Sequence, residues 1–262
     1  MSRQYLVPAV TRALKVLELL SRQDRGMTIS EIHRALALPL STSANLVYTL
    51  QTLGYLDRDA DDSRYQLSLK MLGVSRRVLG RMDFLGRCHG LLEELARESR
   101  LTAHLAVMRD CESIYVDRVA TDGFVQFSSY VGMRWPAHSS AVGKALLAFL
   151  PEPELRRMLK QIRLHRVTPR TITSRRILEN QLRSFRRLGY AWEMEEGEAG
   201  VACVAAPLFG PLGDVVAAAS VTGTTQQIPK NRIAPIGLLV RKYSQLMSSR
   251  LGAVSDSNAQ GY

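Results

Sequence analysis

The sequence predicts a protein of two parts: a mostly α-helical N-terminal domain that ends in a two-stranded wing and, after a linker helix, a C-terminal α+β domain with an antiparallel sheet. Three observations predict this fold class. Capped amphipathic segments fill residues 8–54, a hairpin pattern follows at residues 55–67, and from residue 101 the apolar spacing changes from helical to alternating. At 262 residues the chain is long enough for two such domains, each with its own core.

The first predicted helix is the amphipathic segment Pro8–Arg22, which Gly26 separates from the next element. Its expected apolar face carries either Val10, Leu14, Leu17 and Leu20 or Val10, Ala13 and Leu17. A second, short helix begins at Thr28, because Glu31 stands three residues later and completes a capping box.

The third predicted helix follows the turn at Pro39, with Ser41 as its N-cap and Gly54 at its C-terminal end. The side chains expected to pack inward are Leu46, Leu50 and Leu53. Residues 55–58 and 64–67 then form two short strands around an Asp-rich loop. Three helices with a short turn before the third, and then a hairpin, make a winged helix-turn-helix. The alternative is a small helical bundle that binds nothing.

Residues 69–97 read as helical, with a break near residues 80–83, and form a linker into the second domain. The apolar residues Leu69, Leu72, Val78 and Leu79 give this linker a stripe that predicts a role in dimerisation. The expected limits are 1–68 for the winged helix-turn-helix, 69–82 for the linker helix, 83–250 for the α+β domain and 251–262 for a disordered tail.

The second domain begins with three expected strands, at residues 101–110, 111–120 and 123–131. A helix follows from Ser139 or Ser140, and a basic helical region extends to Leu188. Residues 190–223 return to strands, with a hairpin near residues 210–214, and a last helix covers Pro229–Met247. An antiparallel sheet flanked by helices is the layout of a GAF-like or PAS-like sensor domain.

Composition narrows the class of protein. The chain has no apolar run near the roughly 18 residues of a membrane span and no signal-peptide core, so we expect no membrane partner. Three cysteines, far apart and odd in number, fit neither a disulfide framework nor a CxxC site, which predicts a cytoplasmic location. No pattern calls for a metal or a cofactor.

The net charge of +11 does not locate a nucleic-acid surface. Residues 1–68 hold eight Lys/Arg against seven Asp/Glu, a net charge of +1, so the remaining residues carry +10. Residues 152–187 alone hold eleven basic and three acidic side chains. This Arg-rich region has two interpretations: a second nucleic-acid face, or two amphipathic helices whose arginines are solvated or pair with Glu193–Glu198.

The pair Gly143-Lys144 suggests a phosphate-binding loop, but the rest of that motif is missing. The loop needs a glycine five residues before Gly143 and a Ser or Thr after Lys144, and those positions hold His138 and Ala145. The Ser-Ser pair before the apolar run predicts a capped helix start instead, which binds anions through its free N–H groups.

Four segments of the chain resemble the IclR-type bacterial transcription regulators. They are VPAVTRALKVLELL, TISEIHRALALPLSTSANLVYTLQTLGYLDRD, HSSAVGKALLAFLP and GYAWEMEEGEAGVACVAAPLFGPLGDVVAAASVTG, in the family's order and spacing. The resemblance spans residues 8–248. It implies a ligand-responsive regulator of a catabolic operon, with a GAF-like effector domain, which binds palindromic double-stranded operators as a homodimer or tetramer.

The predicted DNA contacts lie on the third helix, the wing and the first helix. Base contacts are expected from Thr42, Ser43, Asn45 and Tyr48. Phosphate contacts are expected from Arg12, Ser41, Thr49, Arg58 and Arg64. The family commonly carries Arg where this chain has Asn45, so the operator sequence of a relative does not transfer.

The resemblance also implies an effector pocket at the helix that begins at Ser139 or Ser140. Its expected lining is Phe127, Trp135, Ala141, Val142, Glu193, Cys203, Ser220 and Thr222. The aromatic residues favour a flat body and the helix start favours an acidic head, so we predict a small organic acid, with aromatic acids among the candidates. Gly143 is expected to allow close packing, and Lys144 to be structural or solvated.

Three alternatives remain open from the sequence. Cys203 with His104 or His138 would make a reactive thiol in a GAF-like sensor or enzyme, although the VACVAAP flank is a buried-strand pattern and we expect no enzyme. A zinc site from His104, His138 and the acidic run matches no standard spacing. An architectural DNA binder without an effector is the third.

Overall fold

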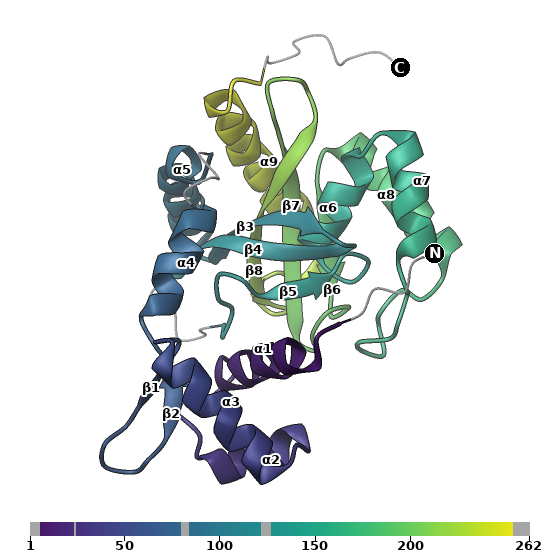
Figure 1. Cartoon of the computed structure of the whole chain (residues 1–262). Helices are drawn as coiled ribbons and strands as arrows, with labels where there is room; N and C mark the ends of the chain where they lie inside the picture. Colours follow the sequence, from purple (N-terminus) through teal and green to yellow (C-terminus); the bar gives the residue numbers. More distant parts are fainter. Residues whose placement is uncertain (1–5, 24, 80–83, 122–126, 254–262) are drawn as a thin grey trace. The chain divides into compact units, whose positions relative to one another are not determined.

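The computed structural model describes residues 6–23, 25–79, 84–121 and 127–253 (Figure 1). The chain divides into two compact units, residues 1–82 and residues 83–262. Each unit has its own core, as the change of apolar period along the sequence predicts.

Unit 1 is a winged helix-turn-helix. Its elements in chain order are α1 (Pro8–Leu20), α2 (Ile29–Leu36), α3 (Leu40–Thr52), β1 (Leu56–Arg58), β2 (Tyr65–Leu67) and α4 (Lys70–Leu79). The strands β1 and β2 pair in antiparallel register, with Leu56 opposite Leu67. The core between the helices and the hairpin consists of Val16, Leu20, Ile32, Val47, Leu50, Leu56 and Tyr65.

The start of α2 is the predicted capping box. The Thr28 hydroxyl accepts from the Glu31 N–H, and the Glu31 carboxylate accepts from the Thr28 N–H at 2.8 Å. The same carboxylate accepts hydrogen bonds from both terminal nitrogens of the wing residue Arg64, at 2.8 and 3.1 Å. These bonds to Thr28 and Arg64 lower the pKa of Glu31. One carboxylate therefore caps a helix and ties the wing to it.

The helices of unit 1 differ in several details from the predicted ones. Val10 and Leu14 are 56% and 54% exposed, because the buried face of α1 follows Val16 and Leu20 instead. The third helix begins at Leu40 with Pro39 at the N-cap, so Ser41 lies inside its first turn. The expected inward position of Leu53 is also wrong, since its side chain is 54% exposed at the end of the helix. Gly54 stands at the C-terminal end as predicted, with the left-handed φ of +76° that glycine favours there.

The linker prediction is tested only in part. The helix α4 is present, and Leu69 and Leu72 on it or beside it are 79% and 63% exposed. The predicted break at residues 80–83, and the side chains of Val78 and Leu79, lie outside the described residues. The same holds for the tail after residue 253.

Unit 2 is built on a six-stranded antiparallel sheet of order β5-β4-β3-β8-β7-β6. The strands are β3 (Thr102–Arg109), β4 (Glu112–Val119), β5 (Arg134–Pro136), β6 (Ala191–Met194), β7 (Val201–Phe209) and β8 (Val215–Thr224). The helices are α5 (Phe84–Ser99), α6 (Ala141–Phe149), α7 (Glu152–Gln161), α8 (Arg175–Leu188) and α9 (Ile233–Arg250), with the short η1 (Lys230–Arg232) before the last.

Helices cover the sheet of unit 2 in two groups (Figure 1). The helices α5 and α9 pack on each other and on β3, β4, β7 and β8, while α6 packs on β6, β7 and β8 and against α8. Residues Ala141 to Ala148 of α6 are all buried, because this helix lies between the sheet and α8. Apart from Lys144, these buried residues are apolar or glycine, as such a central position requires.

One predicted strand of unit 2 is wrong where it is described. Residues 127–131 are not a strand, and residues 122–126 of the same segment lie outside the described residues. Residues 127–129 are fixed by a side chain rather than by strand pairing. The Arg118 guanidinium donates to the Phe127 carbonyl and the Ser129 hydroxyl, each at 3.0 Å. The last helix also begins at Ile233 rather than Pro229.

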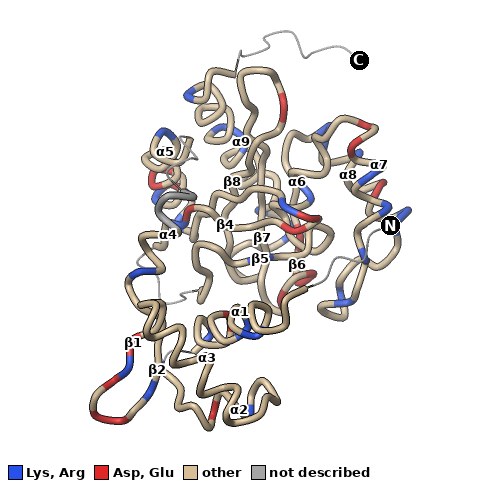
Figure 2. Tube along the Cα trace, viewed as in Figure 1, with Lys and Arg blue, Asp and Glu red and all other residues tan. Residues whose placement is uncertain are grey.

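The Arg-rich region forms α7, α8 and the loop between them, where Lys and Arg recur along the trace (Figure 2). Its arginines make exposed ion pairs within their own helices, Arg156 with Glu152 and Arg157 with Glu154, and Arg170 pairs with Glu195 at 3.0 Å. This pattern fits the interpretation as solvated amphipathic helices. Within the described part of the chain, no helix is both long and apolar enough to cross a membrane.

Candidate functional site

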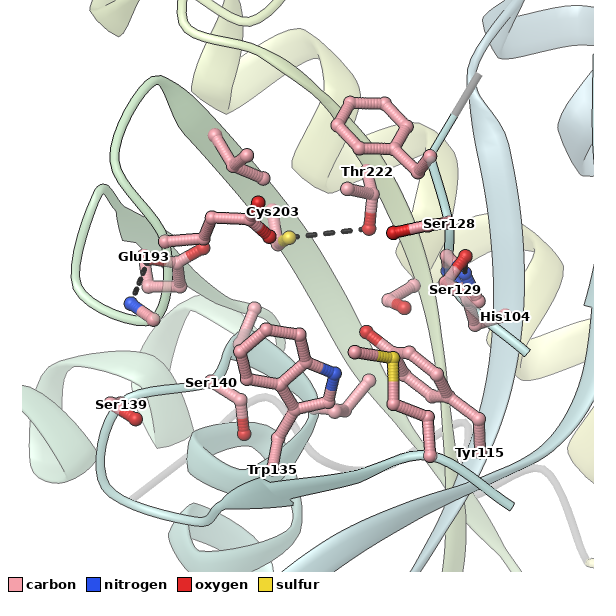
Figure 3. A pocket seen from close by; sticks show the side chains of 18 residues that line it. His104, Tyr115, Ser128, Ser129, Trp135, Ser139, Ser140, Glu193, Cys203 and Thr222 are labelled. Carbon is pink, nitrogen blue, oxygen red and sulfur yellow. Dashed lines mark hydrogen bonds between the residues drawn. The ribbon is translucent and has the colours of Figure 1, made fainter. Parts of the chain in front are cut away.

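A cavity of about 220 Å³ lies in unit 2 between the sheet and the start of α6 (Figure 3). Its lining comes from every strand of the sheet, from the start of α6 and from the loops that precede β5, α6 and β7. The residues are His104, Tyr115, Phe127, Ser128, Ser129, Met133, Trp135, Ser139, Ser140, Ala141, Val142, Glu193, Gly197, Glu198, Val201, Cys203, Ser220 and Thr222. Trp135 and Tyr115 face Cys203 and Thr222 across the hollow (Figure 3).

Strand register places the polar members of the sheet in two rows. Glu193 of β6 pairs with Cys203 of β7, which pairs with Thr222 of β8. His104 of β3 pairs with Ser220 of β8 in the next row. Because paired residues of an antiparallel sheet point to the same face, these side chains gather on the face that α6 covers.

The start of α6 forms the opposite wall. The Ser140 hydroxyl caps the helix by accepting from the Gly143 N–H at 3.2 Å. A Cβ at Gly143 would lie 2.7 Å from that hydroxyl and closer still to Ala137, so only glycine lets the cap close. The first N–H groups of a helix have no partner within it, and those of Ala141 and Val142 belong to residues on the cavity wall.

Three buried polar atoms of the cavity lining have no hydrogen-bond partner among the described residues. They are His104 Nδ1, Trp135 Nε1 and Ser220 Oγ. An unpaired buried polar group costs about 1–3 kcal/mol, so such atoms seldom persist without a purpose. Their concentration in one hollow indicates that a polar ligand or water satisfies them there.

The electrostatic state of His104 follows from its surroundings. Burial, helped by the nearby Arg118 cation, lowers its pKa to about 3, so the imidazole is neutral. Its Nε2 lies 2.9 Å from the Ser129 hydroxyl, which already accepts from Arg118. We assign the Ser129 proton to the bond with Nε2, which leaves the imidazole proton on Nδ1 as a donor at the cavity wall. Tyr115 stacks on the ring at 4.2 Å.

A buried charge cluster supports the wall beside Glu193. Lys144 is fully buried; its ammonium contacts Glu196 Oε1 at 2.5 Å and Gln181 Oε1 at 3.0 Å. Glu193 is 3% exposed and accepts from the Glu196 N–H at 2.8 Å. Burial raises the pKa of Glu193 to about 7 against the opposing effect of these bonds. The prediction that Lys144 is structural is therefore confirmed, and the solvated alternative is wrong.

All eight residues predicted for the effector pocket line this one cavity. Sequence reasoning missed Tyr115, Met133, the segment at Ser128 and Ser129, and the role of His104 in the lining. The alternation of β3 and β4 carried a signal for His104 and Tyr115, since both sit at inward positions of predicted strands. The loop at residues 128–129 carried no such signal.

The cysteine and zinc alternatives gain no support from the geometry. Burial, with the adjacent Glu193 carboxylate, raises the pKa of the Cys203 thiol well above its usual range, which disfavours the thiolate. The thiol contacts the Thr222 hydroxyl at 3.2 Å, while His138 Nε2 bonds the His165 carbonyl instead. Among the described residues no group of three His, Cys, Asp or Glu side chains is arranged to hold a metal ion.

In unit 1 most of the predicted DNA-contact residues are accessible. Arg12, Ser41, Asn45, Tyr48, Thr49 and Arg58 are exposed, and Thr42 is half-buried. The prediction for Ser43 is wrong, because its side chain is fully buried on the inner face of α3 and cannot reach a base edge. Arg64 donates to Glu31 and to the Gly26 carbonyl, so its donors already have partners.

Comparison with known proteins agrees with this architecture. Residues 9–60 match the sequence profile described as the IclR helix-turn-helix domain, and residues 76–249 match that of the bacterial transcriptional regulator IclR C-terminal domain. The chain is 32% identical over 247 residues to the HTH-type transcriptional regulator XynR of Escherichia coli strain K12, with 94% of this chain and 98% of that protein covered.

Two solved structures extend the comparison. The Thermotoga maritima IclR structure superposes with a TM-score of 0.78 at 29% identity, covering 93% of this chain and 98% of that one. An IclR homologue of Microbacterium hydrocarbonoxydans, solved as a complex with 4-hydroxybenzoate, gives a TM-score of 0.78 at 26% identity with the same coverage. The protein belongs to the IclR family of bacterial transcriptional regulators, with a helix-turn-helix DNA-binding domain and a C-terminal effector domain.

Proposed function

We propose that this regulator senses a small organic acid in the cavity of unit 2 and changes its affinity for an operator in response. The observation that carries the proposal is the set of unpaired buried atoms on the cavity wall, His104 Nδ1, Trp135 Nε1 and Ser220 Oγ, beside the open start of α6. Among the described lining residues there is no Lys or Arg, so neutral donors and the helix start must recognise the head group.

Size and shape favour a single substituted ring. A protein cavity of about 150 Å³ is enough for benzene, so about 220 Å³ leaves room for polar substituents. Trp135, Phe127 and Tyr115 supply flat apolar walls on which such a ring packs. The complex of the Microbacterium homologue with 4-hydroxybenzoate supports this ligand class.

The DNA-binding half of the proposal uses the exposed surface of unit 1. The α3 residues Thr42, Asn45 and Tyr48 are proposed to reach base edges in the major groove, since amide and hydroxyl side chains match adenine and other edges. Arg12, Ser41, Thr49 and Arg58 are proposed to contact phosphates. Ser43 is left out because its side chain is buried, and Arg64 is left out because its guanidinium already donates to Glu31.

Assembly completes the proposal. Residues 1–68 carry a net charge of only +1, which limits the affinity of a single unit for DNA. A homodimer or tetramer on a palindromic operator would add the missing affinity by joining two recognition helices. We propose residues 69–82 as the linker between the domains at 1–68 and 83–250, and a catabolic operon in the bacterial cytoplasm as the target.

The effector half predicts a thermal shift with acids and none with their amides. At about 100 times its Kd, a matching aromatic carboxylic acid adds about 2.7 kcal/mol, which raises the Tm by roughly 5–10 °C. The corresponding amide lacks the anionic oxygen that the α6 start favours and should shift the Tm by less than about a quarter as much. Differential scanning fluorimetry over paired acids and amides measures this.

A pair of serine variants controls for binding elsewhere. Ser220→Ala removes a donor of the cavity wall and should weaken the acid about tenfold, whereas Ser249→Ala on the exposed face of α9 should leave its affinity unchanged. Equal shifts from acids and amides, or no shift from any acid, would refute an acidic effector.

A further inference from the structure

We propose that an acid effector enters this cavity together with one proton, which Glu193 takes up and holds toward the effector. The proposal deepens the proposed function and rests on it, because it applies to a ligand that arrives as an anion. It assigns to Glu193 the role of the residue that neutralises the charge of the bound complex.

The charges around the cavity call for such a proton. Lys144, Glu193 and Glu196 are all buried, at 0%, 3% and 5% exposure. With both carboxylates ionised, the three groups carry a net charge of −1. A carboxylate bound at the start of α6 would raise this to −2 inside a hollow of about 220 Å³. Like charges this close shift protonation toward the neutral acid.

None of the described residues that face Glu193 is free to supply a positive charge. From α6 it faces Lys144, which is already committed to Glu196 and Gln181. The groups that face it from the other elements are neutral or acidic: Tyr115 of β4, Cys203 of β7, and Glu196 and Glu198 of the loop between β6 and β7. Arg118, the cation beside the lining residue His104, is held by the Phe127 carbonyl and the Ser129 hydroxyl.

The geometry of Glu193 leaves room for the proton. The Glu196 and Gly197 N–H groups both donate to its Oε2, at 2.8 and 3.4 Å, so the proton belongs on Oε1. A protonated Oε1 becomes a donor in a cavity that Glu193 lines. Burial raises the pKa of Glu193 to about 7. Taking this proton from neutral solution therefore costs little free energy.

Calorimetry measures the proton directly. The full-length protein is titrated at pH 8 with an aromatic acid selected by thermal shift, in phosphate and in Tris, whose ionisation enthalpies differ. We expect close to one proton taken up per acid bound. The Kd should rise about tenfold between pH 6 and pH 8, the response expected of one group with a pKa near 7 that must be protonated for binding.

Two variants locate the proton. Glu193→Gln keeps an acceptor for the Glu196 N–H and carries no charge, so it should bind the acid at pH 8 about as tightly as the wild type does at pH 6, without proton uptake. Glu94→Gln, at an exposed carboxyl of α5 outside the cavity lining, should keep the uptake and the pH dependence. Melting curves confirm that both variants are folded.

The outcomes separate the two proposals. Tight acid binding by the wild type with no proton uptake and no change of Kd between pH 6 and pH 8 would overturn the role of Glu193 and leave the acidic effector intact. Retained proton uptake in a folded Glu193→Gln would overturn it as well. Absence of acid binding at every pH would defeat the proposed function itself.

Discussion

Lys144→Met is expected to lower the free energy of unfolding by about 3–5 kcal/mol, the usual cost of removing one partner of a buried ion pair. The Lys144 ammonium is fully buried and neutralises Glu196 at 2.5 Å, while Gln181 accepts from it at 3.0 Å. Methionine fills a similar volume but leaves the Glu196 carboxylate buried without a cation. The chain's two tryptophans, Trp135 and Trp192, both belong to unit 2, so urea unfolding followed by their fluorescence reports this change.

A double variant separates lost charge pairing from lost packing. Lys144→Met with Glu196→Leu replaces the pair by apolar side chains, which is often neutral or stabilising, so most of the loss should be recovered. A double variant that is as unstable as Lys144→Met alone would show that the stabilisation comes from packing of the lysine stem rather than from the ion pair.

Gly143→Ala is expected to destabilise unit 2 by about 1–3 kcal/mol or more, as overpacking against fixed atoms does. The added Cβ would stand 2.7 Å from the Ser140 hydroxyl and nearer to the backbone of Ala137, where nothing flexible can yield. Relief requires the start of α6 to move, which displaces Ala141 and Val142 on the cavity wall. The same urea titration, with the effector's thermal shift, measures both losses.

Gly90→Ala is the matched control for this substitution. Gly90 lies inside α5, and a Cβ there meets nothing within 4 Å. Alanine in a helix interior is more favourable than glycine by about 0.5–1 kcal/mol, so the control should gain stability where Gly143→Ala loses it. Equal effects at the two positions would contradict the steric account.

Local signals in the sequence were enough to predict most elements. The Thr28 and Glu31 capping box, the Ser140 cap and the left-handed Gly54 each follow from side-chain chemistry within a few residues. The strands β3 and β4 follow from their alternating and β-branched content, and β7 follows from VACVAAP, the apolar run of a buried strand. The effector-pocket residues came from resemblance, and the structure brings all eight together.

What the sequence could not predict depends on contacts distant along the chain. The segment after residue 126 has the composition of a strand, but it forms a loop, in which Arg118 donates to the Phe127 carbonyl and the Ser129 hydroxyl. Nothing near Lys144 in sequence shows that Glu196 and Gln181 will enclose it. That the polar atoms of His104, Trp135 and Ser220 lack partners cannot be predicted from the sequence, because it depends on how three strands and a helix meet in the fold.

One variant distinguishes base recognition from general attraction to DNA in any binding experiment with this protein. Asn45 is exposed on α3 and its amide matches an adenine edge. Asn45→Ala should therefore weaken the operator complex by roughly 1–3 kcal/mol while leaving affinity for random DNA unchanged. The same variant is the control when the effect of the acid on DNA binding is measured.

We expect an acid in the cavity of unit 2 to alter the affinity of unit 1 for an operator. Fluorescence anisotropy with DNA from the region upstream of its own gene, at fixed salt and with and without saturating acid, measures it most directly. A coupling of about 1–3 kcal/mol predicts that the acid changes the Kd for this DNA about 5- to 150-fold, while random DNA responds little. An unchanged Kd at saturating acid, or equal affinity for upstream and random DNA, would contradict the account.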